Sequence, residues 1–300
     1  FFSFLVKSCW VFRFDRAMSV GSNLRGAKRQ REDAKEDEGY SLPDFDVALD
    51  HTSIWSERHD LKTEHGAPDH AIPLCIADMD LPCCPRILAA LAERCKHPTL
   101  GYTIMPGELR RAVVTWLQNQ HGWSVDPQAL IFSHLAVGGW VNCLRAFTEP
   151  GDVVFFMTPL YPPLQEAVER EGRRALRYSL DCKSGTLHLD TSRLEARLRE
   201  SAARLLLLCN PHNPSGRVWL KEELVEILAI CRRLGVLVVS DDVWSDWCLW
   251  GHRYCPVASL AKSPSEVVTL IGPNKTWNLA GLQTSFVVVT DPELRTKFMR

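Results

Sequence analysis

From residue 85 onward, amphipathic helical segments alternate with short apolar segments. Residues 85–95, the stretch after Gly107 and residues 221–233 each place apolar side chains on one helical face. Seven short apolar or β-branched runs lie at 131–133, 153–157, 175–180, 205–209, 236–240, 267–271 and 286–289. Most lack polar alternation, as expected for strands covered by helices on both faces. The pattern predicts an α/β fold with a mostly parallel seven-stranded sheet flanked by helices.

The composition narrows the kinds of partner that the chain can have. A formal net charge of -1 over 300 residues provides no field that would attract a polyanion, so no nucleic-acid partner is expected. No apolar run has the length of a bilayer span, and no membrane partner is expected either. A small molecule is the expected ligand.

The cysteines indicate the compartment. Their number, 11, is odd, none forms a CxxC pair, and several fall inside apolar runs. Cysteines of this kind are typical of reduced core residues in a cytoplasmic protein. No metal site is predicted.

The chain divides into three parts by composition. Residues 1–39 mix aromatic, basic and acidic side chains, with a basic tract at 28–31, and are expected to be a disordered extension or an error of gene prediction. Residues 40–84 are expected to form an N-terminal arm and the start of a small domain. Residues 85–300 are expected to form one large domain.

Chemistry-bearing side chains follow three of the predicted strands, within residues 210–216, 240–244 and 272–283. Ligands of parallel sheets bind beyond the carboxyl ends of strands. Taken singly, a lysine there is usually a surface group and an aspartate is usually a helix cap. An amide, an acid and a lysine at successive strand ends can instead surround one flat aromatic cofactor that acts as an electron sink.

Each of these side chains has a chemical role in such a site. Lys275 would form an imine with a cofactor aldehyde, and Asp241 would keep a pyridine nitrogen protonated. Asn213 would donate a hydrogen bond to the ring oxygen. Tyr161 would stack on the ring, although it could equally be a packing aromatic in a proline-rich loop. The segment Ala136, Val137 and Gly138 opens a helix, whose N-H groups suit a phosphate.

The order of several motifs resembles the fold-type I pyridoxal-phosphate enzymes, and within them the cystathionine β-lyase or cysteine-S-conjugate β-lyase branch near the class I and II aminotransferases. The resemblance runs from about residue 45 to residue 300. The motifs that carry it are PLCIADMDL at 73–81, GYT at 101–103, RAFTEPGD at 145–152, NPHNPSGRVW at 210–219 and KTWNLAGLQTS at 275–285.

The resemblance implies a cofactor, a set of roles and an assembly. The cofactor would be pyridoxal 5′-phosphate, with Lys275 as the Schiff-base lysine. Tyr102 matches a tyrosine that reaches the phosphate of the neighbouring subunit, which implies a homodimer. Within the first motif, Ala77 and Asp78 are expected at the substrate. Residues 85–300 would then be the large cofactor-binding domain.

Three positions and the end of the chain depart from the family pattern. Trp244 stands where aminotransferases usually carry Tyr and the lyase branch carries His, so a hydrogen bond to the ring is altered or lost. Leu135 replaces a usual Gly of the phosphate loop, and Gln283 replaces an Arg of many aminotransferases. The sequence ends 25 positions after Lys275. We therefore expect a fragment in which the C-terminal small domain is absent.

The expected activity is a lyase reaction that cleaves cystathionine or a related cysteine S-conjugate to pyruvate, ammonia and a thiol. An aminotransferase is the alternative, because the two reactions share their early steps. A truncated, non-catalytic relative is the second alternative, favoured by Trp244 and Leu135. The presence of Lys275, Asp241 and Asn213 together argues against it.

Overall fold

The computed structural model describes residues 43–51, 54–64, 66–68, 70–183 and 185–300. The predicted extension at 1–39 and its basic tract lie outside the described residues. The chain divides into two units between Leu109 and Arg110. The division expected before residue 85 stays a prediction.

In the part of the first unit that the structure describes, turns and irregular chain connect the helices α3 (Glu57–Glu64) and α4 (Pro85–Cys95). Helix α4 begins at the predicted residue because proline has no N-H and suits the first helical turn. Its Ile87 and Ala90 side chains are buried. The predicted helix after Gly107 is also present, as α5 (Gly107–His121), and continues into the second unit.

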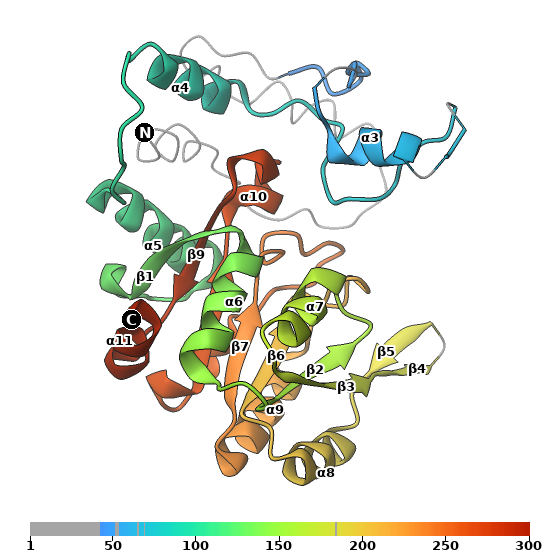
Figure 1. The fold of residues 1–300 in the computed structure, drawn as a ribbon, viewed down its shortest axis with the longest axis vertical. Helices are drawn as coiled ribbons and strands as arrows, with labels where there is room; N and C mark the ends of the chain where they lie inside the picture. Colours follow the sequence, from blue (N-terminus) through green and yellow to red (C-terminus); the bar gives the residue numbers. More distant parts are fainter. Residues whose placement is uncertain (1–42, 52–53, 65, 69, 184) are drawn as a thin grey trace. The chain divides into compact units, whose positions relative to one another are not determined.

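A seven-stranded sheet forms the centre of the second unit (Figure 1). Its strands in chain order are β1 (Leu130–His134), β2 (Val153–Thr158), β3 (Arg174–Ser179), β6 (Leu205–Cys209), β7 (Leu237–Asp241), β8 (Val267–Ile271) and β9 (Thr284–Val288). Their spatial order is β1-β9-β8-β7-β6-β2-β3. Strand β9 is antiparallel to β1 and β8, and the other neighbouring pairs are parallel. The mostly parallel sheet and all seven predicted strands are therefore confirmed.

Helices and a small hairpin connect these strands. The helices are α6 (Leu135–Phe147), α7 (Pro162–Arg170), α8 (Thr191–Ser201), α9 (Lys221–Leu234), α10 (Pro273–Thr276) and α11 (Pro292–Met299). Short 3-10 turns occur at η1 (Pro127–Ala129), η2 (Val257–Leu260), η3 (Pro264–Glu266) and η4 (Ala280–Leu282). The hairpin consists of β4 (Asp181–Lys183) and β5 (Thr186–His188). Among the described residues, no helix has both the length and the apolar character that a bilayer crossing requires.

The core lies on both faces of the sheet, because successive strand residues point to opposite sides. Phe155 and Met157 of β2 join an apolar cluster with α8 and α9, whereas Val154 and Phe156 join a second cluster with α6 and α7. Burial of one such phenylalanine contributes about 1.5–3 kcal/mol. The sheet is thus a platform fixed from both sides.

Helix α6 approaches the sheet closely at Gly139. A Cβ atom at this position would lie 2.8 Å from Val287 Cγ2 of β9, a separation that side chains do not adopt. At Gly138 the nearest atom would be 3.7 Å away. The close approach of α6 to β9 thus depends on Gly139.

Candidate active site

The carboxyl ends of β1, β2, β6, β7 and β8 meet at one edge of the sheet, because these five strands run in the same direction (Figure 1). The segments that follow them carry most of the predicted site residues, namely Ala136, Val137, Gly138, Tyr161, Asn213, Asp241, Trp244 and Lys275. Strand β9 runs in the opposite direction and therefore begins at this edge, directly after Gln283. The topology brings together residues that are up to 139 positions apart in the sequence, as Ala136 and Lys275 show.

Asp241 is the last residue of β7, and its side chain is buried. Its Oδ1 atom accepts one long hydrogen bond, 3.4 Å, from the Val243 N-H. Burial raises the pKa of Asp241 to about 6, while the Val243 N-H and the charge of Lys275 lower it. The carboxylate therefore lies where a charged N-H donor would be strongly stabilised.

The neighbouring Asp242 is also buried, but its oxygens are already occupied. The hydroxyl groups of Ser240 and Tyr254 donate to its two carboxylate oxygens. Burial raises the pKa of Asp242 to about 8, against the lowering effect of these two hydrogen bonds. Of the two acids, Asp241 is therefore the one whose oxygens have fewer partners, and its contact with the cofactor stays a prediction.

Lys275 lies in the one-turn helix α10, directly after β8. Its Nζ atom is 5.6 Å from the centre of the Trp244 ring, within the range of a cation–π contact. The Trp247 indole N-H donates to the backbone oxygen of Lys275 at 3.1 Å. Trp244 therefore presents a ring face to the ammonium group at the position where the family pattern has Tyr or His.

Asp246 attaches α10 to the rest of the unit. Its carboxylate accepts hydrogen bonds from Thr276 Oγ1 at 2.6 Å and from Trp116 Nε1 at 3.0 Å, and it pairs with His121 Nε2 at 2.9 Å. The sequence analysis did not identify Asp246. Its position shortly after Asp241 was a weak signal, but its partners on α5 are more than 100 positions away.

The loop after β6 is tied to β7 and contains Asn213. The Asn210 N-H donates to the Asp241 backbone oxygen at 2.9 Å, which extends the contact between the two strands. The Asn213 N-H donates to Cys209 Sγ at 3.2 Å. Asn213 is half-buried and follows the end of β6, which adjoins the end of β7.

Several buried polar atoms at this edge lack a hydrogen-bond partner among the described residues. They are Asn210 Oδ1, His212 Nε2 and Asn274 Oδ1. Burial and the charge of Arg217 lower the pKa of His212 to about 4, so its ring is neutral at pH 7. An unpaired buried polar group costs about 1–3 kcal/mol. These atoms, together with Asp241, fit an edge that binds a polar ligand.

The first turn of α6 contains Ala136, Val137 and Gly138 and has no side-chain cap. The first N-H groups of an α-helix have no acceptor within the helix, so they and the helix dipole favour an anion. The Ser285 hydroxyl donates to the Ser133 backbone oxygen at 3.2 Å and so holds the end of β1 beside β9. The assignment of Ala136, Val137 and Gly138 to a phosphate site stays a prediction.

Leu135, at the start of α6, has a φ of 60°. This left-handed conformation is unfavourable for a residue with a Cβ atom and favours glycine. The Leu135 N-H donates to the Gln283 backbone oxygen at 3.3 Å, and Gln283 itself has a φ of 48°. Leu135 thus replaces the usual Gly at a position where the backbone has a positive φ.

Tyr161 lies at the N-cap of α7, just beyond the carboxyl end of β2. Its side chain is partly exposed, with 41% of its surface accessible. The ring is therefore not a core residue, and its stacking role stays a prediction.

The remaining predicted residues, Ala77, Asp78 and Tyr102, belong to the first unit. Ala77 and Tyr102 are exposed, and the Asp78 backbone oxygen accepts a hydrogen bond from Arg58 Nη1 at 2.7 Å. Their proposed contacts with substrate and with a second subunit stay predictions.

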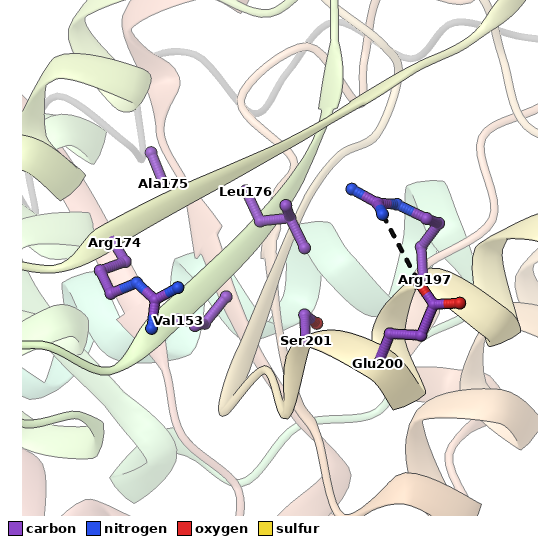
Figure 2. Close-up of a pocket in the computed structure, with 7 residues that line it drawn as sticks. All are labelled: Val153, Arg174, Ala175, Leu176, Arg197, Glu200 and Ser201. Atoms are coloured by element: carbon purple, nitrogen blue, oxygen red, sulfur yellow. Dashed lines mark hydrogen bonds and ion pairs between the residues drawn. The ribbon is translucent and has the colours of Figure 1, made fainter.

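A pocket of about 340 Å³ lies elsewhere in the second unit (Figure 2). Its lining residues are Val153, Arg174, Ala175, Leu176, Arg197, Glu200 and Ser201. They come from the first residues of β2 and β3 and from α8, so the pocket lies at the amino ends of the strands. It is therefore separate from the edge that carries Asp241 and Lys275.

Comparison with known proteins gives a family and several relatives. The model of the family described as aminotransferase class I and II matches residues 69–300. Cystathionine beta-lyase PatB of Bacillus subtilis is 40% identical over 255 residues, which are 85% of this chain and 66% of PatB.

Solved structures with the same fold include two pyridoxal-phosphate proteins. Cystalysin from Treponema denticola, which contains the cofactor, superposes with a TM-score of 0.82 at 29% identity, over 86% of this chain and 66% of that one. The C-S lyase from Staphylococcus hominis, also solved with the cofactor bound, gives 0.80 at 26% identity, over 85% and 66%. The chain thus spans slightly less than two thirds of these relatives.

Proposed function

Because the chain belongs to the aminotransferase class I and II family, we propose that it is the cofactor-binding part of a carbon–sulfur β-lyase that uses pyridoxal 5′-phosphate. The proposed reaction consumes cystathionine, or a related cysteine S-conjugate, and one water, and it releases pyruvate, ammonia and a thiol. The observation that carries the proposal is the buried Asp241 carboxylate beside Lys275 at the ends of two neighbouring strands. The likeness to PatB supports the choice of a lyase.

The residues at the carboxyl edge fit this cofactor. When bound, pyridoxal phosphate draws electrons from the Cα atom of the attached amino acid. Asp241 would keep the ring nitrogen protonated, Asn213 would donate to the ring oxygen, and Tyr161 would stack on the ring. The first turn of α6 would hold the phosphate.

Lys275 would have two tasks. It would hold the cofactor covalently before substrate arrives, and its Nζ atom would then receive the proton that leaves Cα. The electron pair left behind forms a Cα–Cβ double bond while the Cβ–S bond breaks and the thiolate leaves. Trp244, 5.6 Å from Nζ, would limit the directions in which the amine can move.

Borohydride reduction followed by peptide mapping tests the assignment of Lys275. The protein loaded with pyridoxal phosphate should carry a pyridoxyl group on Lys275, and Lys275→Ala should carry none at that position. A label on another lysine in the wild-type protein would show that the covalent site lies elsewhere.

Pyruvate release tests the reaction type. With cystathionine and no added keto acid, a lyase should release pyruvate, ammonia and thiol in equal amounts over many turnovers. An aminotransferase, the alternative that the family match itself favours, would stop after one turnover until a keto acid is supplied. Turnover that depends on 2-oxoglutarate or pyruvate would therefore replace the lyase proposal by the alternative.

The strained Leu135 and the unusual Trp244 favour a non-catalytic relative as the second alternative. This alternative predicts neither a pyridoxyl label on Lys275 nor pyruvate. A label without turnover would indicate a protein that binds the cofactor but has lost the reaction.

We further propose a homodimer in which Tyr102 of each subunit reaches the cofactor phosphate of the other, with Ala77 and Asp78 at the substrate. The support is the resemblance of the GYT and PLCIADMDL motifs. Mixing Tyr102→Phe subunits with Lys275→Ala subunits should produce heterodimers with one intact site, so activity should partly return. Subunit exchange without recovery of activity would contradict shared sites.

The proposed location is the cytoplasm. All ten described cysteines are free thiols, which is typical of a reducing compartment.

A further inference from the structure

Two histidines and an aspartate converge around α3 in the first unit. His51 precedes α3, His59 lies in its first turn, and Asp80 lies in the irregular chain before α4. The Nε2 atoms of His51 and His59 are 3.6 Å and 3.5 Å from Asp80 Oδ1. One ligand atom of each residue lies within 4.8 Å of the other two.

Hydrogen bonding accounts for little of this arrangement, because the one between His59 Nε2 and Asp80 Oδ1 is long, 3.5 Å. Separations of 3.5 Å and 3.6 Å exceed the 2.7–3.2 Å of a good N-H to oxygen bond. His51 Nε2 is buried and has no hydrogen-bond partner among the described residues. The rings of His51 and His59 stack at 4.4 Å with an angle of 8°. Two ring nitrogens thus lie beside one carboxylate oxygen.

Arg58 holds Asp80 in place from the other side. Its Nε and Nη2 atoms donate to the Pro73 backbone oxygen at 2.9 Å and 2.7 Å, and Nη1 donates to the Asp78 backbone oxygen. Nη2 also lies 3.1 Å from Asp80 Oδ2. Oδ1 therefore remains directed toward the histidines. Carboxylates that bind metals are commonly held in this way through their second oxygen.

We propose that His51, His59 and Asp80 bind a divalent transition-metal ion of the zinc type. Bonds of about 2.0–2.2 Å in a tetrahedral site place ligand atoms about 3.3 Å apart. The observed 3.5 Å and 3.6 Å separations from Asp80 Oδ1 would close by a few tenths of an ångström, and all three ligand atoms lie within 4.8 Å of one another. Imidazole nitrogen ligands select zinc and its neighbours over magnesium or calcium, and three protein ligands leave one position for water.

Such an ion would join three separate segments of the first unit. These are the chain before α3, α3 itself, and residues 73–80, which are already tied to Arg58. The last segment carries Ala77 and Asp78. The ion would therefore stabilise the arm that holds the proposed substrate residues, but its binding does not depend on the proposed reaction.

Titration with Zn²⁺ alone tests the site. The protein, kept reduced, is titrated calorimetrically beside His51→Gln, His59→Gln and His70→Gln. The first two variants should weaken binding more than about 100-fold, beyond the roughly 10- to 100-fold loss caused by removal of an outer partner. His70 is an exposed histidine of the same unit outside the cluster, so His70→Gln should bind like wild type. Equal affinity in all four proteins would overturn the proposal.

Two measurements on the wild-type protein distinguish the proposed site from zinc bound by cysteine. Exposed thiols such as Cys75 and Cys95 could also bind zinc. Co²⁺ in the proposed site should give tetrahedral d–d absorption without thiolate charge-transfer bands, and such bands would assign the ion to cysteine. Zn²⁺ should also protect His51 and His59 from diethyl pyrocarbonate, measured by mass spectrometry. Equal modification with and without Zn²⁺ would refute the site even if the variants fail to fold.

Discussion

Replacing Asp241 by Asn should make the cofactor-free protein more stable at neutral pH, although it removes a residue that the proposed reaction needs. Asp241 is only 5% exposed, and the hydrogen bond it receives from Val243 is long, 3.4 Å. The buried charge is therefore poorly compensated until a cationic ring nitrogen binds beside it. The neutral amide of Asn avoids this penalty.

The size of the effect follows from the pKa. Burial raises the pKa of Asp241 from its ordinary value of 3.8 to about 6. A carboxyl whose pKa is higher in the folded state favours folding fully below pH 3.8, and this contribution is lost as the pH rises through about 6. At about 1.36 kcal/mol per pKa unit, the loss is about 3 kcal/mol above pH 7 and roughly half of that at pH 5.

Urea unfolding of both proteins without cofactor, at pH 4, 5 and 8, measures the difference. Asp241→Asn should gain little at pH 4 and about 3 kcal/mol at pH 8 relative to wild type. Added pyridoxal phosphate should reverse the order at pH 8, because only the wild-type carboxylate gains an ion pair from the ring. If Asp241→Asn were less stable than wild type at pH 8 without cofactor, the burial argument would be wrong.

Three further predictions concern backbone geometry and packing. Leu135→Gly should be more stable than Leu135→Ala by about 1 kcal/mol, because the φ of residue 135 is positive. Asn142, which is exposed in the same helix, is the control, and there the Ala variant should be more stable than the Gly variant by about 1 kcal/mol. Urea unfolding of the four variants decides, and a preference for Ala at both positions contradicts the assigned φ. Asp246→Asn should lower the free energy of unfolding by about 1.5–3 kcal/mol and slow borohydride labelling of Lys275, since the Thr276 hydroxyl loses a charged acceptor. Unchanged labelling would show that Asp246 does not position the lysine. Gly139→Val should lower the free energy of unfolding by at least about 1–3 kcal/mol, because its side chain would collide with β9. Thermal melting tests this, and an unchanged melting temperature would refute the close approach.

The strands could be predicted because buried strands have a simple apolar pattern in the sequence. A strand covered on both faces, such as β6 with its five buried residues, is a continuous apolar run. The antiparallel direction of β9 could not be predicted, because its apolar run resembles that of β8 and the direction depends on how the connecting chain turns. The β4–β5 hairpin is short and largely polar, so no periodic pattern distinguishes it from a loop.

Part of the candidate site could be predicted for the same reason. Asp241 ends one apolar strand and Lys275 lies shortly after the neighbouring one, and parallel strands bring such residues together at one edge. The supports of Lys275 could not be predicted, because Trp116 and His121 contact Asp246 across 130 and 125 positions. The sequence assigns the ring-nitrogen role to Asp241, and the structure adds that hydroxyl groups already contact the neighbouring Asp242.

The two central residues of the candidate site are held by different kinds of structure. Asp241 ends a strand that is paired with β6 and β8, so it shares the stiffness of the whole sheet. Lys275 lies on one helical turn that side chains of residues 246 and 247 hold from outside. The sheet therefore fixes the position of Asp241, whereas the position of Lys275 can be altered by changing a few loop side chains. Residues 244–247 are thus the place where an altered reaction outcome can arise without a change in the strands themselves.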